Sequence, residues 1–367
     1  MTVAACRRGG RSENPAMPYE LLLTATRTIT LAPYDEPPIA PREVRAEGIV
    51  SGISHGTELA HYRGGSPFAG KRFDTDLRLF VEDDESRAYP MRLGYEWVGT
   101  VTQTGAEVQA PRVGDLAHLS LPHRETHTFA VDDDRKPLTP LPGDLDPERA
   151  AFLSSATIAL QAIQDARLKV GDTVAVFGLG VFGLLAVQLA RLSGARWIAG
   201  VDPIAGRREL AGRLGADAVL DPAAADVGSE IKVGAGTGGV DAAIEFSGRY
   251  SALHAALRSA RLAGTVVAAG FYTGGAGDDL RLGEEWHHNR LTLVSSMSGW
   301  GAPHREAGWD RPRLRATVLE LIASGRLEVD ALVTQRIPFA QAARAYDLID
   351  REPETTLKVL LEYPARG

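Results

Sequence analysis

Three glycines at a fixed spacing carry the clearest chemical signal in this chain. Gly178, Gly180 and Gly183 form the pattern G-x-G-x-x-G directly after the apolar run Val174–Phe177. Apolar residues then recur at helical spacing as far as Gly194, which is typical of a helix end. A glycine turn between a strand and a helix lets a pyrophosphate approach the backbone, where free N–H groups and the positive end of the helix dipole bind it.

An acidic residue ends the next apolar run. Asp202 follows Trp197–Val201 and lies 202 − 183 = 19 positions after Gly183, close to the separation of about 20 expected for an acid that binds ribose hydroxyls. Together these features predict a dinucleotide site, with a purely structural strand-helix-strand unit as the alternative. The Asp202 carboxylate would repel a 2′-phosphate, whereas Arg207 and Arg208 could attract one. NAD is therefore expected, with NADP as the alternative.

Composition limits the class of protein. The chain has 367 residues, enough for two domains, with 44% hydrophobic and 24% charged residues. The net charge of −7 and the scattered basic residues argue against a nucleic-acid footprint. No apolar run approaches the length of about 20 residues needed to cross a bilayer. Cys6 is the sole cysteine, so an internal disulfide is excluded and a cytoplasmic location is expected. Residues 1–18 are predicted to form a loose extension.

Secondary-structure signals change character along the chain. From Tyr19 to Val131, short alternating segments such as Leu21–Ile29 are separated by turns that contain proline or glycine, which predicts a β-rich region. After Gly171, strands alternate with helices such as Ser251–Leu262. This alternation predicts a parallel, doubly wound sheet.

Short motifs throughout the chain resemble one family. They are Gly52-Ile-Ser-His-Gly-Thr-Glu58, Tyr62-Arg-Gly64, Gly94-Tyr-Glu96, Arg112-Val-Gly-Asp115, Gly171-Asp-Thr173, the glycine turn, Leu214-Gly-Ala-Asp217 and Ile337-Pro-Phe339. This set resembles the medium-chain dehydrogenase/reductase superfamily, which contains zinc-type alcohol and polyol dehydrogenases and zinc-less relatives. The resemblance implies an α/β fold: a GroES-like β-rich catalytic domain at residues 19–155 and 302–367, and a Rossmann dinucleotide-binding domain at 156–301.

The chain departs from the zinc-dependent members at their metal ligands. Those members carry a cysteine, a histidine, and a cysteine or acid at three positions. Here Ser54 or His55 stands at the first position, Tyr95 at the second and Leu153 at the third. Leucine cannot bind zinc, which prefers sulfur, imidazole or carboxylate ligands. The four-cysteine structural lobe is also missing, so the resemblance implies a zinc-less member with no metal.

Hydride transfer to a carbonyl develops alkoxide charge, which a positioned proton donor must stabilise when no metal is present. The resemblance makes Tyr95 the first candidate and His55 the second, with Thr57 as a proton relay toward the cofactor ribose. The alternatives are a packed aromatic ring for Tyr95 and a hydrogen-bonded turn residue for His55. Glu58 and Glu96 are also catalytic candidates, although buried acids that hold the loop are the favoured interpretation.

The resemblance further implies a set of cofactor contacts. Thr157 would lie beside the nicotinamide, unless it is an ordinary threonine near a helix N-terminus. The complete predicted set is Gly178, Gly180, Val181, Phe182, Gly183, Asp202, Arg207, Thr157, Gly270, Phe271, Ser296 and Met297. Family members commonly dimerise edge to edge, and the apolar segment Leu291–Val294 is the expected outer strand. An exposed apolar edge favours pairing, so a homodimer is predicted.

The leading functional prediction is a zinc-independent, NAD(H)-dependent oxidoreductase that interconverts a secondary alcohol and a ketone. The segments GISHGTE and HHNRLTLVSS are similar to zinc-less relatives of specialised metabolism, including bacteriochlorophyllide-type and cyclitol or sugar dehydrogenases. They indicate a polyol, sugar-like or other bulky substrate. The alternatives are reduction of an activated C=C bond and an inactive cofactor-binding protein. The long segment Gly65–Pro90 is either a lid or binding loop, or a solvated surface excursion.

Overall fold

The computed structural model describes residues 17–83, 89–132, 138–236, 238–273, 279–297 and 308–365. Apart from Met17 and Pro18, the predicted extension at residues 1–18 lies outside this part of the chain. The expected domain boundary at 301/302 also lies outside it. No helix in the described ranges is long and apolar enough to cross a membrane.

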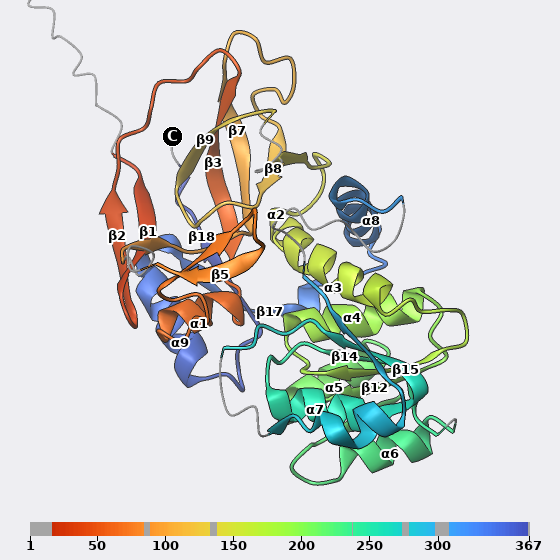
Figure 1. The fold of residues 1–367 in the computed structure, drawn as a ribbon. Helices are drawn as coiled ribbons and strands as arrows, with labels where there is room; N and C mark the ends of the chain where they lie inside the picture. The colour runs from red at the N-terminus through yellow and green to blue at the C-terminus, as the bar shows by residue number, and fades with distance from the viewer. Residues whose placement is uncertain are drawn as a thin grey trace, which may run out of the picture.

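A parallel sheet forms one half of the molecule (Figure 1). Its strand order is β13-β12-β11-β14-β15-β16 and every neighbouring pair is parallel. This is the order of a doubly wound dinucleotide-binding sheet, which confirms the predicted fold class. The strands are β11 (Thr173–Phe177), β12 (Trp197–Val201), β13 (Ala218–Leu220), β14 (Val240–Glu245), β15 (Ala260–Ala268) and β16 (Thr292–Ser295).

Both faces of this sheet are buried, because the strand side chains alternate between two cores. Val174 and Val176 of β11 pack into a core shared with helices α3, α4, α5 and α8, whereas Ala175 and Phe177 pack against α6 and α7. A strand buried on both faces reads as a continuous apolar run, which is why β11 was recognisable. The helices are α3 (Leu153–Asp165), α4 (Val181–Leu192), α5 (Ala205–Arg213), α6 (Val227–Gly234), α7 (Tyr250–Ser259) and α8 (Arg311–Ala323).

The other half is β-rich and receives the C-terminal segment (Figure 1). Its largest sheet runs β10-β8-β7-β3-β18-β17, with β9 also paired to β3. A smaller sheet has the order β2-β1-β6. The elements are β1 (Tyr19–Ala25), β2 (Thr28–Pro33), β3 (Glu43–Gly52), α1 (Thr57–Tyr62), β6 (Met91–Arg92), β7 (Trp97–Thr104), β8 (Leu116–Leu119), β9 (Thr126–Ala130), β10 (Leu138–Pro140), α2 (Pro147–Ala150), β17 (Val333–Pro338), α9 (Ala342–Arg351) and β18 (Lys358–Glu362).

Two expected elements are wrong in their bounds. The segment Leu21–Ile29 is not one strand: β1 ends at Ala25, and the chain turns through Arg27 at φ +58° before β2 begins. The helix expected over Ser251–Leu262 ends at Ser259, because Ala260 pairs with Val240 and starts β15. In contrast, β16 lies at the outer edge as expected, and among the described strands it pairs with β15 only.

Candidate active site

The glycine turn has the geometry that dinucleotide binding requires. Gly178 adopts φ +85°, and a Cβ there would lie 2.8 Å from the Ser247 backbone nitrogen. A Cβ on Gly183 would lie 1.9 Å from the Gly178 carbonyl oxygen, so the helix packs directly on the turn. A Cβ on Gly180 would meet no atom within 4 Å. The backbone of Gly180, which caps α4, therefore faces open space that a pyrophosphate can occupy.

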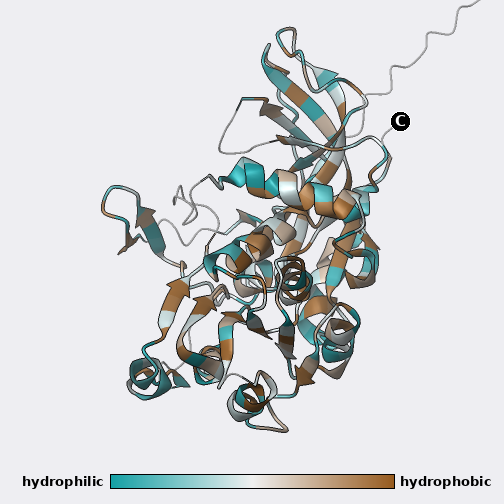
Figure 2. Ribbon diagram, turned by 90° about the vertical axis from the view of Figure 1, so that its right-hand side faces the viewer, coloured by the Kyte–Doolittle hydropathy of each residue, from teal (hydrophilic) through white to brown (hydrophobic). Residues whose placement is uncertain are grey.

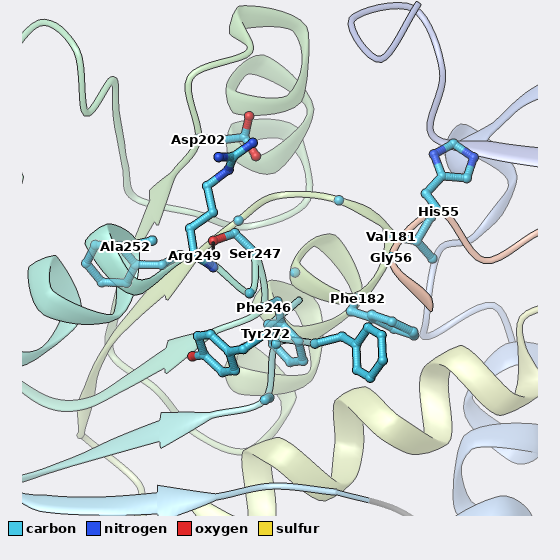
Figure 3. A pocket seen from close by; sticks show the side chains of 18 of the residues that line it. His55, Gly56, Val181, Phe182, Asp202, Phe246, Ser247, Arg249, Ala252 and Tyr272 are labelled. Atoms are coloured by element: carbon cyan, nitrogen blue, oxygen red, sulfur yellow. Dashed lines mark hydrogen bonds between the residues drawn. The ribbon is translucent and has the colours of Figure 1, made fainter. Parts of the chain in front are cut away.

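A cleft of about 1530 Å³ extends from this turn into the space between the two halves. Every residue of the predicted cofactor set except Thr157 lines it, as do three of the five catalytic candidates, Tyr95, His55 and Thr57. In Figure 3, His55 and Gly56 from the β-rich half lie beside Val181, whereas Asp202 lies farther along the parallel sheet. The cleft thus joins the cofactor-binding and catalytic candidates in one site.

Asp202 is fixed at the ribose end of the cleft. Its two carboxylate oxygens accept hydrogen bonds from the backbone N–H groups of Leu179 and Ile204, each at 2.8 Å. The Arg207 guanidinium lies 3.9 Å from the carboxylate, but it donates to the carbonyls of Pro353 and Thr356. Burial lowers the pKa of Arg207, an effect that the nearby acid opposes. Arg207 therefore links the parallel-sheet half to the segment before β18.

Two other arginines surround this region. Arg208 donates to the carbonyls of Asp202 and Pro203 and pairs with Asp221 at 3.1 Å. Arg249, from the connection after β14, is exposed and lines the cleft, and Figure 3 shows it extending toward Asp202. Sequence reasoning missed Arg249, since no motif marks it.

Three hydroxyl groups meet at the other end of the cleft. The Tyr95 hydroxyl donates to Ser54 Oγ at 2.5 Å, and the Thr57 side chain also hydrogen-bonds it. Ser54, which with His55 is one of two residues that the resemblance equates with the first zinc ligand, thus lies next to Tyr95, which it equates with the second. Burial raises the pKa of the Tyr95 phenol, and the charge of Glu96 raises it further. The phenol therefore stays protonated at neutral pH and can act as a hydrogen-bond donor.

Glu58 does not line the cleft, which corrects its candidacy for direct catalysis. Its carboxylate accepts hydrogen bonds from the Ser54 backbone N–H at 2.8 Å and from the Tyr346 hydroxyl, and lies 3.0 Å from His123 Nε2. Burial alone would raise the pKa of Glu58, but the charge and hydrogen bond of His123 and the other bonds lower it. Glu58 therefore positions the Ser54 loop from behind, and His123 and Tyr346 are partners that sequence reasoning missed.

Glu96 is also a buried partner and not a cleft residue. One carboxylate oxygen accepts from the backbone and side chain of Ser155, at 2.5 and 2.6 Å, and the other lies 2.6 Å from Lys358 Nζ. The side chains of Glu96 and Lys358 are 0% and 1% exposed. This ion pair joins the loop that carries Tyr95 to α3 and β18.

The remaining two candidates differ from expectation. Burial, with the charges of Lys358 and Arg207, lowers the pKa of His55 to about 3. His55 is thus neutral near pH 7, which argues against proton exchange at neutrality, and its Nε2 is buried with no partner among the described residues. Thr157 does not line the cleft, because its hydroxyl is turned to the Leu153 carbonyl at 2.6 Å, one helical turn back. Ser155 and Ile158 of the same helix line the cleft in its place.

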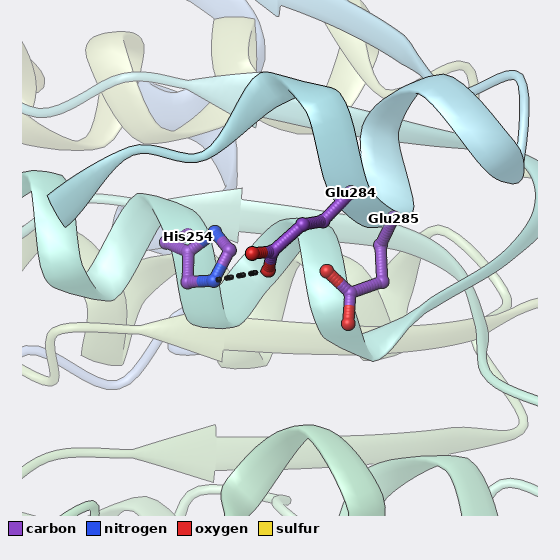
Figure 4. Close-up of side chains that lie close together, drawn as sticks. All are labelled: His254, Glu284 and Glu285. Carbon is purple, nitrogen blue, oxygen red and sulfur yellow. Dashed lines mark ion pairs between the residues drawn. The ribbon is translucent and has the colours of Figure 1, made fainter. Parts of the chain in front are cut away.

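One group of potential metal ligands lies elsewhere. His254, Glu284 and Glu285 place ligand atoms within 4.8 Å of one another (Figure 4). However, Arg258 already pairs with Glu285 at 3.3 Å. The Arg258 guanidinium is thus the cation that this group already binds. Its ion pair with Glu285 ties α7 to the turn Leu282–Trp286.

Comparison with known proteins identifies the family. The model of a family described as zinc-binding dehydrogenase matches residues 181–309. D-guloside 3-dehydrogenase of Escherichia coli (strain K12) is 33% identical over 346 residues, covering 93% of this chain and 98% of that protein. The crystal structure of 2R,3R-butanediol dehydrogenase from Bacillus subtilis superimposes with a TM-score of 0.76 at 24% identity, covering 95% and 100% of the two chains.

A second solved structure shares the fold. A zinc-binding dehydrogenase from Sinorhizobium meliloti 1021, described as bound to NADP, has a TM-score of 0.76 at 24% identity and covers 95% of this chain and 99% of its own. The full-length relationship to D-guloside 3-dehydrogenase, the glycine turn and the strand order agree. The chain belongs to the medium-chain dehydrogenase/reductase superfamily and is a nicotinamide-dependent oxidoreductase that acts on CH–OH and C=O groups.

Proposed function

We propose that the protein is a zinc-independent, NAD(H)-dependent dehydrogenase that interconverts a secondary alcohol and a ketone on a polyol, sugar-like or cyclitol-like substrate. The observation that carries this proposal is the Tyr95 hydroxyl in the cleft, hydrogen-bonded to Ser54 where zinc-dependent relatives bind metal. The full-length similarity to a D-guloside 3-dehydrogenase supports a sugar-like substrate.

The side chains at the former ligand positions do not fit zinc. Ser54 and Tyr95 present neutral hydroxyl groups, and the pKa of Tyr95 is raised, which disfavours the anionic form that a metal would need. His55, the alternative at the first position, has an imidazole that could bind zinc, but among the described residues it is not part of a group of three potential ligands. Leu153 is 0% exposed and has no ligand atom. Zinc sites in proteins require thiolate, imidazole or carboxylate donors in tetrahedral arrangement. The mechanism proposed here therefore includes no metal.

The side chains at the cleft suit acid catalysis of ketone reduction. The nicotinamide cofactor, when bound, supplies or accepts the hydride. Tyr95 donates a hydrogen bond, and then a proton, to the substrate oxygen as negative charge develops there. To donate to the substrate, the phenol O–H turns away from Ser54 Oγ, and the Ser54 and Thr57 hydroxyls then donate hydrogen bonds to the phenol oxygen. Thr57 would relay the replacement proton from solvent by way of the cofactor ribose. Glu58 fixes the Ser54 backbone, so this donor is positioned before substrate arrives.

Removal of metal is the experiment that tests the proposal. Turnover should survive exhaustive dialysis against a chelator, because no described group at the reacting end of the cleft forms a zinc site. Elemental analysis of the active enzyme should find much less than one zinc per chain. A tightly held stoichiometric zinc, with activity lost on its removal, would overturn the proposed mechanism.

Cofactor preference provides a second prediction. Binding of NADH should be tighter than binding of NADPH, because the Asp202 carboxylate would repel a 2′-phosphate and Arg207 and Arg208 are engaged elsewhere. Fluorescence titration of the purified protein with both reduced cofactors measures this directly. Tighter NADPH binding would contradict the NAD assignment and would identify Arg249 as the first residue to replace.

The remaining predictions on organisation are part of the same proposal. A homodimer joined along β16 is supported by the position of this strand at the sheet edge and by the 37% exposure of Leu293. A monomer by light scattering would contradict it.

We assign residues 19–155 and 302–367 to the catalytic domain and residues 156–301 to the Rossmann domain. We also assign a cytoplasmic location to the protein.

A further inference from the structure

The long segment between α1 and β6 contains a separate β-hairpin. Strands β4 (Lys71–Asp74) and β5 (Leu79–Glu82) pair with each other and with no other described strand. The hairpin projects from the rest of the fold (Figure 2). An isolated two-stranded hairpin is marginally stable in water. Contacts outside its backbone must therefore hold it in place.

A row of aromatic rings supplies those contacts. Phe73 and Phe80 lie within the hairpin with their ring centroids 5.0 Å apart, and Phe80 stacks on Phe68 at 4.9 Å with an interplanar angle of 11°. Phe68 then contacts Phe271 at 5.4 Å. Phe271 belongs to the parallel-sheet half, three residues after the end of β15. The row therefore connects the hairpin on the β-rich half to the opposite side of the cleft.

Phe68 adjoins residues that line the catalytic cleft. Gly65, three residues before it in the chain, and Phe271, its ring partner, both line the cleft. Arg63 and Ala60 line the same side, next to Thr57. Among Phe68, Phe80 and Phe271, only Phe271 lines the cleft itself, so a substituent meets the other two rings where it extends out of the cleft past Phe271. We call the surface formed by these three residues the aromatic wall.

We propose that the aromatic wall is a specificity element that selects substrates with an apolar alkyl or aryl substituent, such as the aglycone of a glycoside. This inference rests on the proposed alcohol dehydrogenase function. Ring faces bind apolar groups and other rings, whereas their negative quadrupole disfavours anionic groups. The wall continues outward into exposed apolar surface, since Phe80 and Leu79 are 46% and 58% exposed. Binding of an apolar group there removes this surface from water.

The test compares two substrates that differ only at the anomeric substituent. For methyl and phenyl β-D-guloside, we expect wild-type kcat/KM to favour the phenyl compound by about tenfold. In Phe68→Ala, that ratio should approach one, through a higher KM for the phenyl compound, with kinetics on the methyl compound and NADH affinity unchanged. Leu77→Ala is the control, because it removes an apolar side chain, 67% exposed, from the turn of the same hairpin outside the row of rings, and it should keep the ratio near its wild-type value.

Calorimetric titration of both glycosides into the NADH complex makes the same comparison without turnover. Absence of turnover by the wild type on both compounds would count against the proposed function and leave this comparison intact. Equal affinity of wild type and Phe68→Ala for the phenyl compound would overturn the aromatic wall. If Phe68→Ala does not fold, Phe68→Leu can replace it, because leucine keeps apolar volume but removes the ring. This variant should lower the phenyl-to-methyl ratio of kcat/KM severalfold. An unchanged ratio would overturn the inference equally.

Discussion

Replacement of Tyr95 by phenylalanine is expected to lower turnover by about 100-fold or more, while affinity for NADH stays the same. The change deletes one hydroxyl and keeps the ring that lines the cleft. Loss of one positioned donor at a developing oxyanion typically costs on the order of 10²- to 10³-fold in turnover. Steady-state kinetics with one ketone substrate, together with NADH titration, would measure both quantities.

Two comparisons make the assignment to Tyr95 specific. His55→Ala should leave turnover within a few fold, since the pKa of His55, lowered to about 3, keeps it neutral throughout the working range. For the same reason, His55 should cause no inflection near pH 6.5 in the pH dependence of wild-type turnover. The pH profiles of the wild type and of His55→Ala should therefore agree in this range. Wild-type turnover in Tyr95→Phe with a collapse in His55→Ala would move the donor role to His55. No effect of either change would place the donor elsewhere.

The direction of the Tyr95 pKa shift also predicts a pH dependence. A phenol with a raised pKa is protonated at all ordinary pH values, so it is ready as an acid for ketone reduction. Alcohol oxidation requires the opposite state, a group that accepts a proton. The rate of alcohol oxidation should therefore keep rising with pH through the alkaline range. The rate of ketone reduction should not fall through ionisation of Tyr95 until a much higher pH.

The parts of this site that could be predicted are those that the chain encodes locally. The glycine turn, the strand before it and the helix after it are contiguous, so steric requirements at Gly178 and Gly183 are visible in the spacing alone. Asp202 follows from the same unit. The position of β16 at the sheet edge was implied by the resemblance to a family whose members commonly pair along this edge.

The parts that were missed depend on residues far apart in the sequence. Glu58 meets His123 and Tyr346 across 65 and 288 positions, and no local pattern relates them. Thr157 has the sequence context of a cofactor contact, but its hydroxyl bonds to its own helix. The turn at Arg27 lacks glycine, asparagine or proline, so the two strands on either side read as one. One signal was available: Lys358 lies within the apolar run Leu357–Leu361, where it is the first residue of β18, and a buried lysine needs a partner.

The buried ion pair between Lys358 and Glu96 gives the second large prediction, which concerns stability. Replacement of Lys358 by methionine is expected to lower the free energy of unfolding by about 3–5 kcal/mol, because it leaves the Glu96 carboxylate buried without its ammonium partner. The lysine also lies over the Phe152 ring at 5.2 Å and against Gly52, where a Cβ would be 2.3 Å from the lysine Cε. Equilibrium urea unfolding, followed by circular dichroism and tryptophan fluorescence, measures the change.

Two controls separate the buried charge from simple loss of a contact. Arg336 and Glu148 form an exposed two-point ion pair, with the arginine side chain 49% exposed, so Arg336→Met should cost only about 1 kcal/mol or less. The double replacement Glu96→Gln with Lys358→Met removes both charges and should recover much of the lost stability, since an uncompensated buried charge is the main cost. If the single and double variants were equally unstable, the cost would lie in packing around Gly52 and Phe152 and not in the unpaired carboxylate. If Lys358→Met were as stable as Arg336→Met, the ion pair would not be what holds the Tyr95 loop to β18. The proton donor would then be positioned by the hydrogen bonds of Ser154 and Ser155 to this loop and by the contacts of Glu58.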